Sequence, residues 1–113
     1  MGLDLTIAVD DYHGLSTPST YTRLAFHGRY YHLFDALEKQ ASPVGKILWY
    51  GDDGLKEVTT NPYGTPILSI DADEMIALID SHKNADELGT WDVAVVAFIR
   101  ALPPDTAIYL WFH

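Results

Sequence analysis

The sequence predicts a single α+β domain in which a small, mainly antiparallel sheet packs against two or three helices in two layers. First, residues 3–10 alternate apolar and polar side chains and residues 107–113 are almost wholly apolar, so both ends of the chain are predicted strands. Second, three segments between them carry apolar residues at helical spacing. Third, 113 residues with 48% hydrophobic side chains, 20% charged side chains and no internal repeat suit one globular domain spanning residues 1–113.

The first half of the chain contains one predicted helix between shorter segments. Residues 11–19 are rich in Asp, Gly, Ser, Thr and Pro and predict a loop, and residues 21–26 alternate enough to predict a second strand that His27 and Gly28 end. A helix is expected over residues 29–40 because four apolar side chains recur at positions i, i+3, i+4 and i+7: Tyr30, Leu33, Phe34 and Leu37.

The middle of the chain predicts one further strand and a long connection. Residues 41–45 contain Pro43 and Gly45 and end the helix, and residues 46–50 are apolar enough to form a strand. Asp52, Asp53 and Gly54 predict a turn. Residues 55–64 are polar and interrupted by proline and glycine, so we expect mostly loop there.

The second half of the chain predicts two helices and the final strand. Residues 66–70 form a short apolar segment, and Asp71 with Glu74 resembles a capping box that starts a helix. Its predicted buried side consists of Met75, Ile76, Leu78, Ile79 and His82. Residues 91–102, with Thr90 as the expected N-cap, are apolar nearly all round, which predicts the central helix of the domain.

Charge and composition exclude several classes of function. Sixteen acidic residues against seven basic ones give a net charge of −9, which argues against binding to nucleic acids or anionic membranes. No cysteine is present, so disulfides and zinc–thiolate sites are excluded. Because no segment is long enough to span a bilayer and the N-terminus lacks a secretory signal pattern, we expect a cytoplasmic protein.

Acidic residues are concentrated in one part of the chain. Seven of them lie between Asp71 and Asp92, against Lys83 alone. This segment predicts a surface for a basic partner through Asp73, Asp80, Asp86 and Glu87; the alternative is that the acids only keep a small protein soluble.

Catalytic motifs are weakly represented, and no cofactor is predicted. The serines occur without a nucleophile elbow, and neither a phosphate-binding loop nor an EF-hand is present, so an enzyme is not favoured. The remaining candidates for a metal site or a general base are Asp10, Asp11, His13 and His32, provided that the first loop folds over the first helix. The alternative is a set of scattered surface histidines.

Aromatic residues predict a recognition surface. Tyr31, flanked by Arg29 and His32, is one candidate contact, and Trp49 with Tyr50 beside two aspartates is a second. The alternative is that most of these rings pack in the core.

The start of the chain (Met1-Gly2-Leu3-Asp4-Leu5-Thr6), residues 23–37 and the ending Trp111-Phe112-His113 resemble small phage and prophage proteins that begin with the letters MGLDI and end in Phe-His. The resemblance implies a bacteriophage or mobile-element origin and carries no established activity. Together these features predict a small acidic protein-interaction module, encoded by a phage, that binds or inhibits a host protein such as a defence protein. The alternatives are a metal-binding protein or small hydrolase with a His/Asp site, and a phage structural or assembly component that forms a homo-oligomer.

Overall fold

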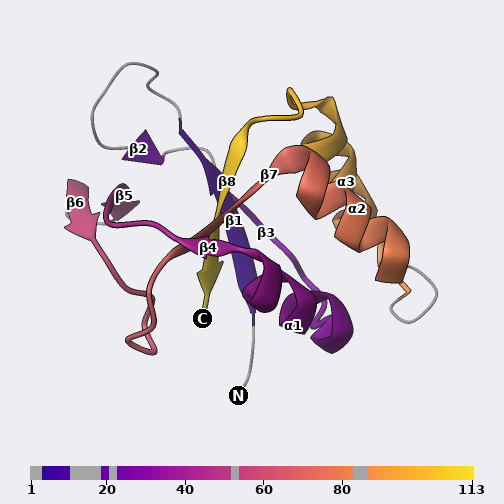
Figure 1. Ribbon diagram of the computed structural model, residues 1–113, viewed down its shortest axis with the longest axis horizontal. Helices are drawn as coiled ribbons and strands as arrows, with labels where there is room; N and C mark the ends of the chain where they lie inside the picture. The colour runs from indigo at the N-terminus through magenta and orange to yellow at the C-terminus, as the bar shows by residue number, and fades with distance from the viewer. Residues whose placement is uncertain (1–3, 11–18, 21–22, 52–53, 83–86) are drawn as a thin grey trace.

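A computed structural model describes residues 4–10, 19–20, 23–51, 54–82 and 87–113, and it shows the predicted α+β fold (Figure 1). The three helices are α1 (Tyr31–Gln40), α2 (Ala72–His82) and α3 (Thr90–Ala101). The strands are β1 (Leu5–Val9), β2 (Ser19–Thr20), β3 (Arg23–Ala25), β4 (Ser42–Pro43), β5 (Ile47–Gly51), β6 (Gly54–Val58), β7 (Leu68–Asp71) and β8 (Ala107–Phe112).

The two ends of the described chain pair with each other in the central sheet. This sheet is antiparallel throughout, in the order β3-β1-β8-β7-β4. β1 and β8 pair from Leu5 opposite Phe112 to Val9 opposite Ile108. The predicted strands at both ends are therefore confirmed, and the apolar C-terminal strand lies in the middle of the sheet, where both of its faces are covered.

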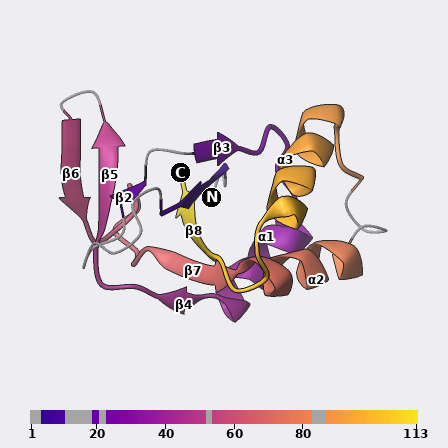
Figure 2. The same cartoon turned by 90° about the horizontal axis from the view of Figure 1, so that it is seen from above.

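The helices cover one face of the central sheet (Figure 2). Alternate residues of β8 point toward them, because successive side chains of a strand point to opposite faces. These residues are Ile108, Leu110 and Phe112, and they join one buried cluster with the apolar sides of the helices, which include Leu33, Phe34, Leu37, Met75, Ile79, Val95 and Ile99. The apolar face predicted for α1 is thus confirmed, whereas of the side predicted for α2 Met75 and Ile79 are buried and Ile76, Leu78 and His82 are half-buried.

A second sheet, in the order β2-β5-β6, packs on the other face of the central sheet. Buried Ile47 and Ile67 meet Ala8 and Tyr109 there. The Trp49 and Trp111 rings stack with centroids 4.3 Å apart and planes 15° apart. The aromatic stack therefore joins the two sheets.

The sequence does not predict this second sheet, and the expectation of a loop over residues 55–64 is wrong for its first part. β6 pairs with β5 from Gly51 opposite Gly54 to Ile47 opposite Val58. Its exposed Lys56 and Glu57 weaken the apolar pattern that would have indicated a strand. Two residues of the expected turn, 52 and 53, lie outside the described residues, as do residues 11–18 of the first expected loop.

Helix α2 begins where the sequence predicts, but its start is capped differently. The backbone N–H groups of Ala72 and Asp73 donate to the carbonyl oxygens of Thr106 and Pro104, at 2.9 and 3.1 Å. The N–H of Glu74 donates to Asp73 Oδ1 at 2.9 Å. The loop before β8 thus satisfies the first donors of the helix, which would otherwise be left without partners.

Candidate protein-binding surface

Helix α3 lies at the surface of the molecule, so the prediction of a central helix is wrong. Asp92, Val95, Val96 and Ile99 are its buried residues. Trp91 is 44% exposed and Val93 55% exposed. We define the outer face of α3 as its exposed residues without charge: Thr90, Trp91, Val93, Ala94, Ala97 and Ala101.

The outer face of α3 differs chemically from the exposed sides of the other two helices. On α1 the exposed residues beyond Tyr31 are polar or charged: His32, Asp35, Glu38, Lys39 and Gln40. On α2 the exposed residues beyond Ala77 are Asp73, Glu74, Asp80 and Ser81. In α3, all of whose residues are described, Arg100 is the one exposed charge. A helix side that faces water normally carries charged residues, so this face resembles one that another surface covers.

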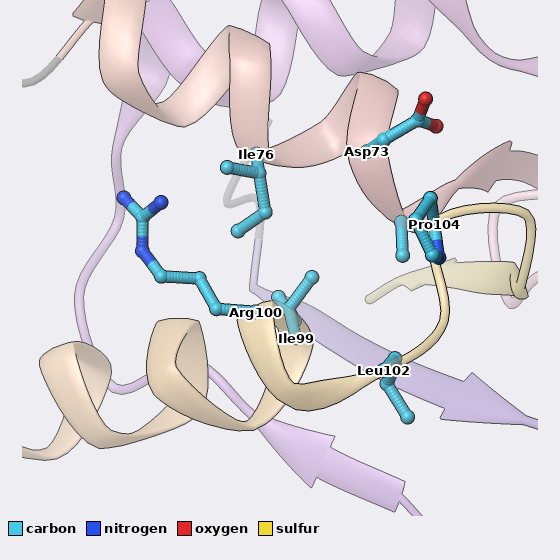
Figure 3. A pocket seen from close by; sticks show the side chains of 7 residues that line it. Asp73, Ile76, Ile99, Arg100, Leu102 and Pro104 are labelled. Atoms are coloured by element: carbon cyan, nitrogen blue, oxygen red, sulfur yellow. The ribbon is translucent and has the colours of Figure 1, made fainter.

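A groove between α2 and α3 adjoins this face. Its first hollow has a volume of about 280 Å³ and lies near the start of α2 (Figure 3). In Figure 3, Ile76 of α2 faces Ile99 of α3, with the Arg100 guanidinium group at one end and the Asp73 carboxylate at the other. Leu102 and Pro104 extend the apolar lining.

A second hollow of about 290 Å³ continues the groove on the other side of Arg100. Val93, Val96 and Ala97 of α3 and Ile79 of α2 supply its apolar walls. Arg100 lines both hollows, and its Nη2 lies 2.5 Å from Asp80 Oδ1. We call the two hollows together the α2–α3 groove; its apolar parts are separated by a neutralised ion pair.

The start of α3 is held in place by a buried polar cluster. The two carboxylate oxygens of Asp92 accept backbone hydrogen bonds from His27 at 2.8 Å and Gly28 at 3.0 Å, and the Tyr30 hydroxyl donates to the same carboxylate. Trp91 Nε1 donates to the carbonyl of Ala25 at 2.7 Å. In the sequence, Asp92 belongs to the acidic segment that begins at Asp71. In the structure its side chain is only 1% exposed and links α3 to the β3–α1 connection through these hydrogen bonds.

The aromatic residues that the sequence predicts as contacts have different surroundings. Tyr31 is 58% exposed, and neighbouring Arg29 lies 3.2 Å from Asp4, which raises the pKa of the guanidinium group. Trp49 is half-buried between Trp111 and Arg23, whose guanidinium carbon lies 4.4 Å from its ring centre. Tyr50 is the next residue of β5. The structure therefore gives Trp49 a packing role between the sheets.

Three of the four acidic residues predicted to bind a partner lie at or beside the α2–α3 groove. Asp73 lines the first hollow, Asp80 lines the second, and exposed Glu87 precedes Leu88, which also lines the second. Asp86 lies outside the described residues. Sequence reasoning did not identify the apolar members of the site, Ile76, Val93, Ala97 and Leu102. The signal in the sequence is the near-absence of charge over residues 91–102, which predicts burial inside the domain.

The structure does not bring together the two described members of the candidate metal site. Arg29, three residues before His32, contacts Asp4 at the start of β1, whereas Asp10 follows the far end of that strand. The five residues of β1 span about 16 Å. Asp11 and His13 lie outside the described residues, and within the described ranges no group of three or more His, Asp or Glu side chains is arranged to hold a metal ion.

Comparisons with known proteins gave no match to a protein-family model, to a curated protein or to a solved structure. Within the described residues, no helix is both long and apolar enough to cross a membrane.

Proposed function

We propose that this protein is a non-enzymatic interaction module that binds a partner protein through the outer face of α3 and the α2–α3 groove. The observation that carries the proposal is a surface helix with one exposed charge, next to two apolar hollows. Burying a valine or a larger side chain completely contributes about 1.5–3 kcal/mol, and Val93 and Trp91 are 55% and 44% exposed, so covering each of them supplies about half of that amount.

The resemblance to small phage and prophage proteins favours a host protein as the partner, and a host defence protein fits this expectation. The acidic surface adds electrostatic attraction to a basic partner, mainly by raising the rate of association.

A pull-down from bacterial lysate with matched variants tests the proposal. Val93→Glu places a charge on the outer face of α3, while Gln40→Glu adds the same charge to the exposed end of α1. We expect a protein retained by the unaltered chain and by Gln40→Glu to be lost with Val93→Glu. Because Val93 is 55% exposed, the variant should remain folded, which circular dichroism checks.

Retention of the same proteins by both variants, or of none by the unaltered chain, would contradict the proposal. Light scattering distinguishes a further outcome. A homo-oligomer that Val93→Glu dissociates would favour the structural or assembly component instead.

A further inference from the structure

We infer that the segment of the partner that binds is a cationic amphipathic helix lying in the α2–α3 groove. This inference rests on the proposed function and specifies the chemistry of the partner. It follows from the spacing of the two hollows and from the charges at the ends of the groove.

The two hollows are spaced to receive neighbouring side chains of one helix. The residues of α3 and its C-cap that line them centre about four positions apart, and those of α2 about six, which corresponds to roughly 6–9 Å along the helix axes. Apolar side chains at positions i, i+4 and i+7 of a partner helix lie about 6 and 10 Å apart along its axis, which covers this separation. A helix pairs its own backbone N–H and C=O groups, so none of them has to lie unpaired against the apolar walls.

The charges around the groove favour a basic helix. Asp73 lies at one end and Glu87 lies beside the other, while Arg100 between them is already paired with Asp80. Among the described residues at or beside the groove, Asp73, Asp80 and Glu87 against Arg100 give a local charge of −3 + 1 = −2. Lysine or arginine residues flanking the apolar side of the partner helix would meet these carboxylates.

The same charges disfavour a second copy of this chain as the occupant. Each copy carries a net charge of −9, and an interface between two copies would bring like-charged surfaces together. Self-association is therefore an outcome that the experiment must be able to detect.

Fluorescence anisotropy with three labelled peptides of about 18 residues, or five helical turns, tests the inference. The first peptide carries leucines along one face and lysines on the others. The second has the same composition in an order that spreads the leucines around the helix, and the third has glutamate in place of lysine. We expect the full protein to bind the first peptide at least about tenfold more tightly than either of the others.

The variants separate binding in the groove from unspecific attraction to an acidic protein. Val93→Glu adds a negative charge, which alone would strengthen binding of the lysine peptide, yet we expect it to weaken binding about tenfold because it blocks the second hollow. Gln40→Glu should leave the affinity within about twofold. The double variant Asp73→Asn, Glu87→Gln should weaken binding about threefold and reduce its dependence on salt.

Equal binding of the lysine peptide to the unaltered protein and to Val93→Glu would overturn the inference, as would tighter binding of the glutamate peptide. Absence of binding at millimolar peptide would also overturn it. The pull-down would still test the proposed function in those cases. If the unaltered chain retained a protein that Val93→Glu did not, the interaction surface would stand and only the cationic helix would be ruled out. If the protein formed a dimer that Val93→Glu dissociated, the occupant of the groove would be a second copy of the chain and not a partner helix.

Discussion

At the scale of single residues, Gly28 is the glycine with the least room for a side chain among those whose surroundings the structure describes. A Cβ atom at this position would lie 2.6 Å from the Tyr30 hydroxyl oxygen and ring. The hydroxyl cannot move aside cheaply, because it donates to buried Asp92 and accepts the N–H of Gly89 at 3.1 Å. In the sequence, Gly28 only marks the end of a predicted strand. In the structure, close packing against Tyr30 requires a glycine at this position.

Gly28→Ala should therefore lower the free energy of unfolding by about 2 kcal/mol, as expected for overpacking in a buried region. Gly45→Ala is the matched control, because its Cβ would meet nothing within 4 Å, and we expect a change of less than about 0.5 kcal/mol. Urea unfolding measures both. Equal stability of the two variants would show that Tyr30 is free to shift.

Asp92 provides a second prediction at this scale. Asp92→Asn keeps the shape of the side chain but replaces an acceptor oxygen by an amide that meets the donors of His27, Gly28 or Tyr30. We expect it to cost about 2 kcal/mol of stability, against less than about 0.5 kcal/mol for exposed Asp105→Asn. If urea unfolding gave the same midpoint for both, the buried cluster would not be what holds the start of α3.

At the scale of elements, the periodicity of apolar residues predicts which residues form a helix. It predicts less well which parts of the molecule cover that helix. The spacing of apolar residues in α1 and α2 correctly identifies their buried sides, because charged residues occupy the opposite sides. In α3 the apolar residues surround the helix, so the pattern does not distinguish a helix inside the domain from one that exposes an apolar face. The candidate site lies on the helix whose environment the sequence leaves undetermined.

The second sheet meets the central sheet through one small buried cluster and the stacked rings of Trp49 and Trp111. Trp49→Ala removes the stack with Trp111 and the contact with Arg23, so we expect a loss of about 2 kcal/mol and faster amide exchange in β5 and β6 than in β1 and β8. Hydrogen exchange followed by NMR measures the difference. Tyr31→Ala, at an exposed position, is the control that should leave all four strands unchanged. Uniform acceleration in all four strands would mean that the two sheets open as one unit.

At the scale of the whole molecule, excess negative charge outweighs the exposed ion pairs. Even if all seven basic residues were paired, nine of the sixteen acidic residues would remain. Pairs such as Lys39 with Asp35 and Lys46 with Glu57 are exposed to solvent and contribute little to stability. The molecule measures 38 × 31 × 24 Å, so at roughly 0.01 M salt, where the screening length is about 30 Å, acidic residues on different elements repel one another over most of the fold.

Sodium chloride should therefore stabilise the protein. Raising its concentration to about 0.5 M shortens the screening length to less than about 8 Å, which weakens the repulsion more than the close ion pairs, and we expect the free energy of unfolding to rise by about 1 kcal/mol. Replacing Glu38, Glu87 and Asp105 by their amides changes the net charge from −9 to −9 + 3 = −6 and should reduce this response. Thermal unfolding of both proteins over a salt series provides the measurement. A melting temperature that falls with salt would mean that the ion pairs outweigh the repulsion. Charge repulsion between two copies of the protein would then not oppose self-association.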